Sequence, residues 1–140
     1  MVMEPISAAI GAAKTVGTLI KLLQEVVQYV KDTKGALTQR DKLLAEINAT
    51  TGLLIQLKRK TEDDEWKPAL DALNAPNGPF DQFKGIMETL SRKLRPVQST
   101  SRKIFTSTTW HFSKPEILKT LAAVERFKSL LTLVLQNKNA

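Results

Sequence analysis

The chain has 140 residues and a formal net charge of +7, from 21 basic and 14 acidic side chains. It contains no cysteine and a single histidine, which excludes disulfides, cysteine-ligated metals and metal sites built from several histidines. The length suits one domain, residues 1–140, with its own apolar core, and the basic surplus favours an anionic partner such as lipid or nucleic acid.

Residues 5–32 predict a first helix with a broad apolar surface and one narrow polar stripe. Glu4 replaces the basic start of a secretory signal. The stripe comprises Ser7, Gly11, Lys14, Thr18, Lys21, Glu25, Gln28 and Asp32. One apolar line comprises Ile6, Ile10, Ala13, Gly17, Ile20, Leu23, Val27 and Val30, and a second comprises Ala8, Ala12, Leu19, Leu22, Val26 and Tyr29.

Two interpretations of this first helix stay open. It is either the central helix of a bundle, enclosed by its neighbours, or a helix that leaves the bundle to enter a bilayer. A solitary membrane span is disfavoured, because a charged side chain such as Lys14 or Lys21 costs about 2.5 to 3.5 kcal/mol at the bilayer centre.

A second helix is predicted over about Leu37 to Lys60, followed by an acidic island, Glu62 to Glu65, and one short helix. The basic end of the second helix suits its dipole. Its expected buried side is Leu43, Leu44, Ile47, Leu54, Ile55 and Leu57, and the short helix is marked by Trp66, Leu70 and Leu73.

Pro79 starts a third helix, which ends before Pro96. Its apolar side is Phe80, Phe83, Ile86, Met87, Leu90 and Leu94. Residues 97–112 give no clear pattern, although Ile104, Phe105, Trp110 and Phe112 would serve as apolar anchors. Ser113 and Glu116 fit a capping box for a fourth helix to about Asn137, with Ile117, Leu121, Val124, Phe127, Leu131 and Val134 at helical spacing.

No strand pattern is present, so the sequence predicts an all-α fold. Helices joined by short or moderate connections pack antiparallel. We therefore expect a four-helix bundle with a short additional helix between the second and third long helices.

The sequence offers no catalytic, cofactor or metal site, and we expect that the protein is not an enzyme. No glycine-rich phosphate loop is present, and His111 sits between two aromatic residues without an orienting carboxylate. The basic residues are most simply solvated, then candidates for anionic lipid, and third for nucleic acid. They are Lys58, Arg59, Lys60, Arg92, Lys93, Arg95, Arg102 and Lys103.

Four blocks of sequence together resemble the N-terminal domain of fungal NLR-like receptors, which is grouped with the HeLo-like cell-death domains. They are MEPISAAI from Met3, NGPFDQFK from Asn77, TWHFSKPEI from Thr109 and VERFKSLL from Val124. The resemblance spans nearly all of the chain. It implies that Met3 is the native start, that Met1 and Val2 are an addition, and that a NACHT module and ankyrin, WD40 or TPR repeats follow in a larger protein.

The resemblance also implies a helical bundle akin to the executioner domain of the mixed lineage kinase domain-like protein and to plant RPW8-type domains. Such a domain is cytoplasmic and is recruited to a membrane when its receptor oligomerises and releases the first helix, in innate immunity and programmed cell death. By its position, the apolar segment from Ile6 to Val30 corresponds to the N-terminal helix that such domains release.

Our first functional hypothesis is therefore a membrane-targeting cell-death effector domain that acts by self-association on anionic membranes. The candidate insertion and oligomerisation residues are Ile6, Ala9, Ile10, Ala13, Val16, Gly17, Leu19, Ile20 and Leu23, and the polar lining would be Ser7, Gly11, Lys14, Thr18 and Lys21. The alternative is a non-lytic interaction module of the same receptor, whose first helix stays in the core. A nucleic-acid-binding bundle is the third hypothesis.

Overall fold

The computed structural model describes residues 4–32, 37–94 and 113–137, with side-chain environments for 11–32, 38–94 and 113–136. These residues form helices and short turns, without a strand, which confirms the all-α class. The elements are α1 (Glu4–Asp32), α2 (Leu37–Arg59), the 3-10 helix η1 (Asp64–Trp66), α3 (Lys67–Leu73), α4 (Pro79–Leu94) and α5 (Lys114–Asn137).

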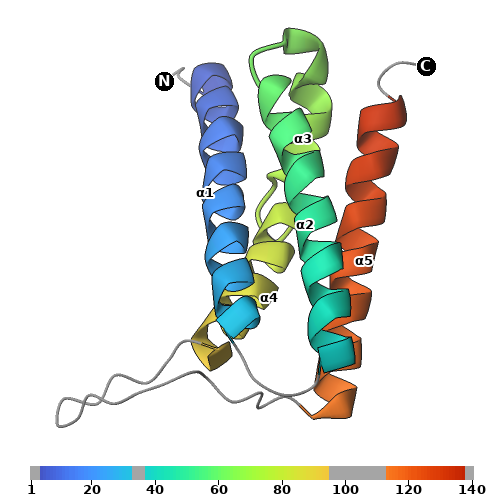
Figure 1. Cartoon of the computed structure of the whole chain (residues 1–140). Coiled ribbons are helices and arrows are strands. Elements are labelled where there is room, and N and C mark those ends of the chain that lie inside the picture. The colour runs from blue at the N-terminus through green and yellow to red at the C-terminus, as the bar shows by residue number, and fades with distance from the viewer. Residues whose placement is uncertain (1–3, 33–36, 95–112, 138–140) are drawn as a thin grey trace, which may run out of the picture.

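The long helices alternate in direction along the chain (Figure 1). α2 returns beside α1, α3 and α4 then run one after the other in the direction of α1, and α5 returns beside α2. α1 packs against α2, α3 and α4, whereas α5 packs against α2 and α4. α1 therefore packs against three other elements, while the polar residues of its outer face remain at the surface.

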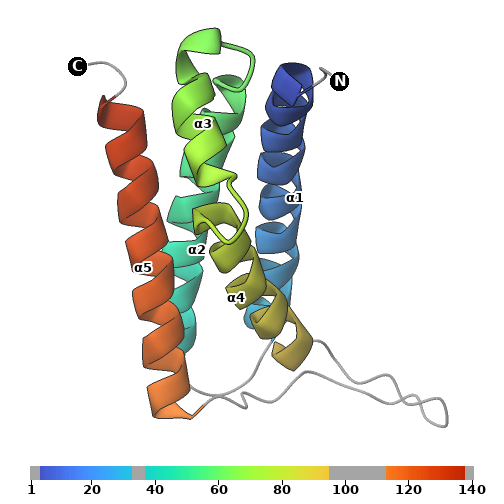
Figure 2. The same ribbon diagram turned by 180° about the vertical axis from the view of Figure 1, so that it is seen from behind.

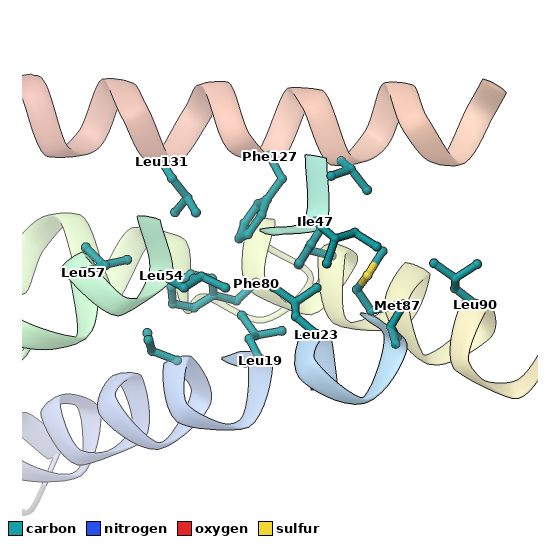
Figure 3. Packing of buried hydrophobic residues seen from close by; sticks show 14 of the residues in the cluster. Leu19, Leu23, Ile47, Leu54, Leu57, Phe80, Met87, Leu90, Phe127 and Leu131 are labelled. Carbon is teal, nitrogen blue, oxygen red and sulfur yellow. The ribbon is translucent and has the colours of Figure 1, made fainter. Parts of the chain in front are cut away.

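The core lies between these helices, and Figure 3 shows part of it from close by. Leu19 and Leu23 of α1 belong to the same buried cluster as Ile47 and Leu54 of α2 and Phe80 of α4. Among the described side chains of α1, the buried ones lie on one line, and they are Ala12, Val16, Leu19, Leu23, Val26 and Val30. This line takes members from both predicted apolar lines, because the core faces the boundary between the two.

At Ile55 the expected burial in α2 is wrong, since its side chain is 38% exposed. Consecutive helical residues point about 100° apart, so the residue after buried Leu54 turns away from α1 and α5. Leu44 in α2 and Val134 in α5 are half-buried against the core rather than within it.

Local signals set the starts of α4 and α5. Before α4, Asn77 takes a positive φ of 61°, and the backbone N–H of Asn77 donates to Asp81 Oδ2 at 2.8 Å. A Cβ on Gly78 would lie 2.8 Å from the Ala75 carbonyl oxygen, so this turn requires glycine.

The capping box predicted at the start of α5 is confirmed. Glu116 N–H donates to Ser113 Oγ at 3.2 Å, and Ser113 N–H donates to Glu116 Oε1 at 2.9 Å. Lys93 of α4 donates to the second Glu116 oxygen at 2.6 Å. The Lys93 hydrogen bond, and then that from Ser113, lower the pKa of the Glu116 carboxyl to about 2.

This capping box makes thermal stability depend on pH in a defined window. A depressed carboxyl pKa contributes stability that is fully present above the unfolded value of 4.5 and is lost as pH falls through about 2. We expect the melting temperature of Glu116→Gln to lie below that of the native chain at pH 7 and to approach it at pH 2. A constant difference across this range, followed by circular dichroism, would contradict the assignment.

Candidate membrane-contacting surface

The outer surface of α1 carries the predicted polar stripe. Lys14, Thr18 and Lys21 are exposed, together with Glu25, Gln28 and Asp32, whereas Gly11 is half-buried. The Ser7 side chain lies outside the described side chains. The stripe faces solvent because the apolar side chains on the opposite side of the helix pack against the core.

The candidate insertion residues do not share one face. Val16, Leu19 and Leu23 point into the core, whereas Ala13, Gly17 and Ile20 are half-buried beside it. The side chains of Ile6, Ala9 and Ile10 fall outside the described side chains. The folded domain therefore keeps half of the described candidates away from any membrane.

Ala13, Gly17, Ile20 and Val27 form a half-buried apolar strip on α1, here called the α2-side flank, in which Ile20 and Val27 also pack against the core. Its position next to α2 follows from Gly17, because a Cβ placed there would lie 3.9 Å from Lys58 Nζ. The Lys58 ammonium thus borders the flank at Gly17. Lys21 lies one turn after Gly17 along the same edge, and the exposed Lys31 continues the line of the flank four residues after Val27.

The opposite flank of α1 is tied to α3 and α4. Glu25 Oε1 accepts a hydrogen bond from Ser91 Oγ of α4 at 3.4 Å, and Glu25 Oε2 accepts one from the Tyr29 hydroxyl at 3.3 Å. A Cβ on Gly11 would contact Asn74 Nδ2 at 3.6 Å. These polar contacts make this flank a seam between helices rather than an open apolar strip.

The predicted lipid-binding cations separate into two groups at opposite ends of the helices (Figure 1). Lys58, Arg59 and Lys60 are exposed at the end of α2, near the beginning of α1. Arg92 and Lys93 are exposed at the far end of α4. Arg95, Arg102, Lys103 and His111 lie outside the described residues.

Both groups of cations have acidic neighbours. Lys60 Nζ lies 5.4 Å from the centre of the Trp66 ring, close to the exposed acidic island Glu62 to Glu65, and Lys93 pairs with Glu116. These acids lower the positive potential at each end. Lys58 has the clearest connection to α1, because it borders the apolar flank.

A groove between α4 and α5 is a feature that the sequence did not reveal. Its two connected hollows measure about 580 and 170 Å³ and share Gln82, Ile86, Ala123 and Arg126. The groove exists because α4 and α5 contact each other less extensively than α1 and α2 do. Figure 2 shows the two helices close together where α4 begins and further apart toward the end where α5 begins. The separation of two helices is a tertiary property, and residue spacing within one helix does not signal it.

No family model, curated protein or solved structure matches this chain significantly. Within residues 4–32, 37–94 and 113–137, no helix is sufficiently long and apolar to cross a membrane. The same residues contain no group of three or more histidine, cysteine, aspartate or glutamate side chains arranged to hold a metal ion. The geometry of α1 and its neighbours is therefore the basis for a functional proposal.

Proposed function

We propose that this protein is the membrane-targeting effector domain of a fungal NLR-like receptor, a four-helix bundle that self-associates and brings α1 onto anionic membranes. The observation that carries the proposal is the α2-side flank. Ala13, Gly17, Ile20 and Val27 keep apolar area accessible in the folded domain, and the cations Lys21 and Lys58 border it. An accessible apolar strip with cations beside it is the arrangement that binds the interface of an anionic bilayer.

Full release of α1 is a costly second step. Val16, Leu19, Leu23, Val26 and Val30 are fully buried, and exposing each large apolar side chain costs about 1.5 to 3 kcal/mol. Their sum, about 8 to 15 kcal/mol, equals the whole stability of a typical domain. Lipid could bury these side chains of α1, but the apolar surface of α2 and α4 that α1 had contacted would be exposed to water.

Self-association resolves this cost. A second copy can shield the apolar face that α1 leaves behind, and several α1 helices can then direct their polar stripes toward one another and their apolar faces toward lipid. We therefore propose an order of events in which surface binding through the α2-side flank precedes release, and release accompanies assembly.

The test compares two variants that add the same charge to the same side of α1. Ile20→Glu places a carboxylate in the α2-side flank, and Gln24→Glu places one at the exposed position one turn along. Both lose attraction to phosphatidylserine, by about 1 kcal/mol per charge near the surface, but only Ile20→Glu also loses apolar contact. We expect Ile20→Glu to bind phosphatidylserine vesicles about tenfold more weakly than Gln24→Glu.

Cosedimentation with phosphatidylserine–phosphatidylcholine vesicles measures this difference, and phosphatidylcholine vesicles are the uncharged control. Equal binding by the two variants, or equal binding to both kinds of vesicle, would contradict the proposal. Removal of residues 1–30 is a poor substitute, because it deletes the buried line of α1 and with it part of the core. Dye leakage from the same vesicles then reports whether binding leads to membrane damage.

An interaction module that keeps α1 in place is the second candidate, and the continuous buried line of α1 favours it. Hydrogen exchange in the presence of the same vesicles separates the two functions. If the amides of α1 stay protected up to the global unfolding limit while α1 is bound to lipid, the interaction module is favoured. If only the amides of α1 lose their protection from hydrogen exchange, the membrane-targeting function is supported.

A further inference from the structure

Ile55 of α2 is a large apolar side chain at the surface, on the side of α2 nearer to α1. Its side chain is 38% exposed. The α1 side of α2 is marked by Lys58, whose Nζ lies 3.9 Å from the Cβ position of Gly17. The α5 side is marked by Glu46, whose Oε1 lies 2.7 Å from Lys128 Nζ. Ile55 is less than one turn from Lys58 but about two and a half turns from Glu46, so it points outward on the α1 side.

Ile55 lies at about the height of the α2-side flank of α1. The two helices run antiparallel, so three residues back from Lys58 corresponds to about three residues on from Gly17, which is Ile20. Side chains lean toward the start of their helix and that of lysine is long, so this register holds to within about one turn. Figure 1 shows α1 and α2 side by side in front of α3 and α4, and Figure 2 shows the opposite face. Ile20 and Ile55 thus lie on adjoining helices of one surface.

The positions of α2 next to Ile55 add little polar surface. Gly52, three residues earlier, is exposed, and a Cβ placed there would meet nothing within 4 Å. Thr51, four residues earlier, is half-buried, and its hydroxyl donates to the Ile47 carbonyl oxygen at 2.9 Å. The donor of this hydroxyl is therefore already used within the helix. An apolar phase can approach Ile55 at this place without removing an unpaired hydroxyl from water.

The two helix stretches that carry this surface contain cations and no acid. Residues 5–24 of α1 and 47–61 of α2 include no aspartate or glutamate, and the register places the two stretches beside each other. Their basic side chains are exposed, and they are Lys14, Lys21, Lys58, Arg59 and Lys60. Charge of one sign around accessible apolar side chains is complementary to an anionic bilayer, which offers negative headgroups above an apolar interior.

The nearest acids lie at the borders of this surface. Glu25, which follows the acid-free stretch of α1, accepts a hydrogen bond from Ser91 of α4 on the opposite flank. Asp32 and Asp41 lie at the other end of the helices, where α1 ends and α2 begins. The acidic island Glu62 to Glu65 follows the end of α2, where the chain turns toward α3 behind that helix.

We propose that Ile55 and Lys58 of α2 join the α2-side flank of α1 in one membrane-contacting surface, so that the domain lies with both helices along an anionic bilayer. This inference rests on the proposed function and adds a second helix to its contact with lipid. α2 stays folded in the bundle when α1 leaves the core, so contact through Ile55 keeps the domain on the membrane during that release. A nucleic acid would attract the same cations but would gain nothing from Ile55.

The absence of cysteine allows this contact to be mapped with single labels. Ile55→Cys and Leu133→Cys each carry one polarity-sensitive NBD fluorophore. Leu133 is the matched control, because it is 53% exposed and lies about two and a half turns after the buried Val124, on the side of α5 opposite the core. We expect phosphatidylserine–phosphatidylcholine vesicles to shift the emission to shorter wavelength at position 55 and to leave it unchanged at position 133. Phosphatidylcholine vesicles are the uncharged control.

The contribution of Ile55 to binding is measured with two variants of α2. Ile55→Glu removes the apolar contact and adds a charge, whereas Asn48→Glu adds the same charge at an exposed position about two turns earlier on the same side. We expect Ile55→Glu to bind phosphatidylserine vesicles about tenfold more weakly than Asn48→Glu in cosedimentation. Circular dichroism checks that both variants fold, and the label at position 55 provides the test if Ile55→Glu does not.

Equal vesicle binding by Ile55→Glu and Asn48→Glu would overturn the proposal, as would equal emission changes at positions 55 and 133. If Ile20→Glu still weakens binding in either case, contact is confined to α1 and the proposed function stands without α2. Duplex DNA that displaces the vesicles, and whose own binding Ile55→Glu and Asn48→Glu weaken equally, would assign the surface to nucleic acid instead.

Discussion

Leu23→Ala is expected to lower the free energy of unfolding by about 2 to 5 kcal/mol. Leu23 is fully buried and lies in the middle of the α1 line that faces the core. Figure 3 shows its side chain directed toward the cluster that Phe80 and Ile47 complete. The substitution removes the transfer free energy of the lost methyl groups and leaves a cavity between α1 and its neighbours, which the rigid helices can fill only in part.

Urea unfolding followed by circular dichroism measures this loss. Leu118→Ala is the matched control, since Leu118 is 52% exposed within α5 and the same atoms are removed. Its unfolding free energy should stay within about 0.5 kcal/mol of the native value. Equal losses at the two positions would mean that α1 is not part of the core and that its release is not costly.

The Leu23→Ala result also bears on activation. If α1 must leave the core before membranes are damaged, weakening its docking by a few kcal/mol should increase vesicle leakage as well as lower stability. Without lipid, the same variant should show faster hydrogen exchange in α1 than in α5, since local opening of α1 becomes easier. An interaction module would lose stability without any gain in leakage.

The helix ends were predictable from sequence because the signals that set them are local. Pro79 begins α4, and Ser113 with Glu116 caps α5, so residues close in sequence decide where each helix starts. The all-α class follows equally from periodicity, because apolar residues spaced three and four apart lie on one face only if the segment is an α-helix.

Which side of α1 packs against its neighbours was not predictable in the same way. Its apolar surface is broad enough to allow several orientations, and contacts with α2, α3 and α4 select the one in which Val16 and Leu19 are central. Helical periodicity identifies a wide arc, but it does not identify which part of that arc meets a neighbour. Ile55 shows the same limit, because it borders the buried side of α2 and turns outward.

In the candidate site, too, the features within one helix were predictable and the features between helices were not. The polar stripe depends only on positions within one helix, so Lys14, Thr18 and Lys21 lie together at the surface as their spacing indicates. The contact between Lys58 and the Gly17 position joins two helices, as does the α4–α5 groove. Features between helices depend on packing angles and register, which no single stretch of this sequence encodes.

Phe127→Ala is the second large effect, with an expected loss of about 3 to 5 kcal/mol in unfolding free energy. Phe127 is 6% exposed and stacks on Phe83 at 4.0 Å with an interplanar angle of 13°. It also meets Phe80 edge to face at 6.2 Å. Since α4 and α5 contact each other less extensively than the other long neighbours do, these aromatic contacts provide much of their attachment.

A double-mutant cycle separates the ring contacts from simple loss of volume. Phe127→Leu and Phe83→Leu each keep an apolar side chain, so each should cost less than the alanine variant. Their coupling energy should be about 0.5 to 1.5 kcal/mol, the value of an aromatic pair beyond its buried area. Urea unfolding of the four chains gives this coupling directly, and additive losses would show that the stack itself contributes nothing.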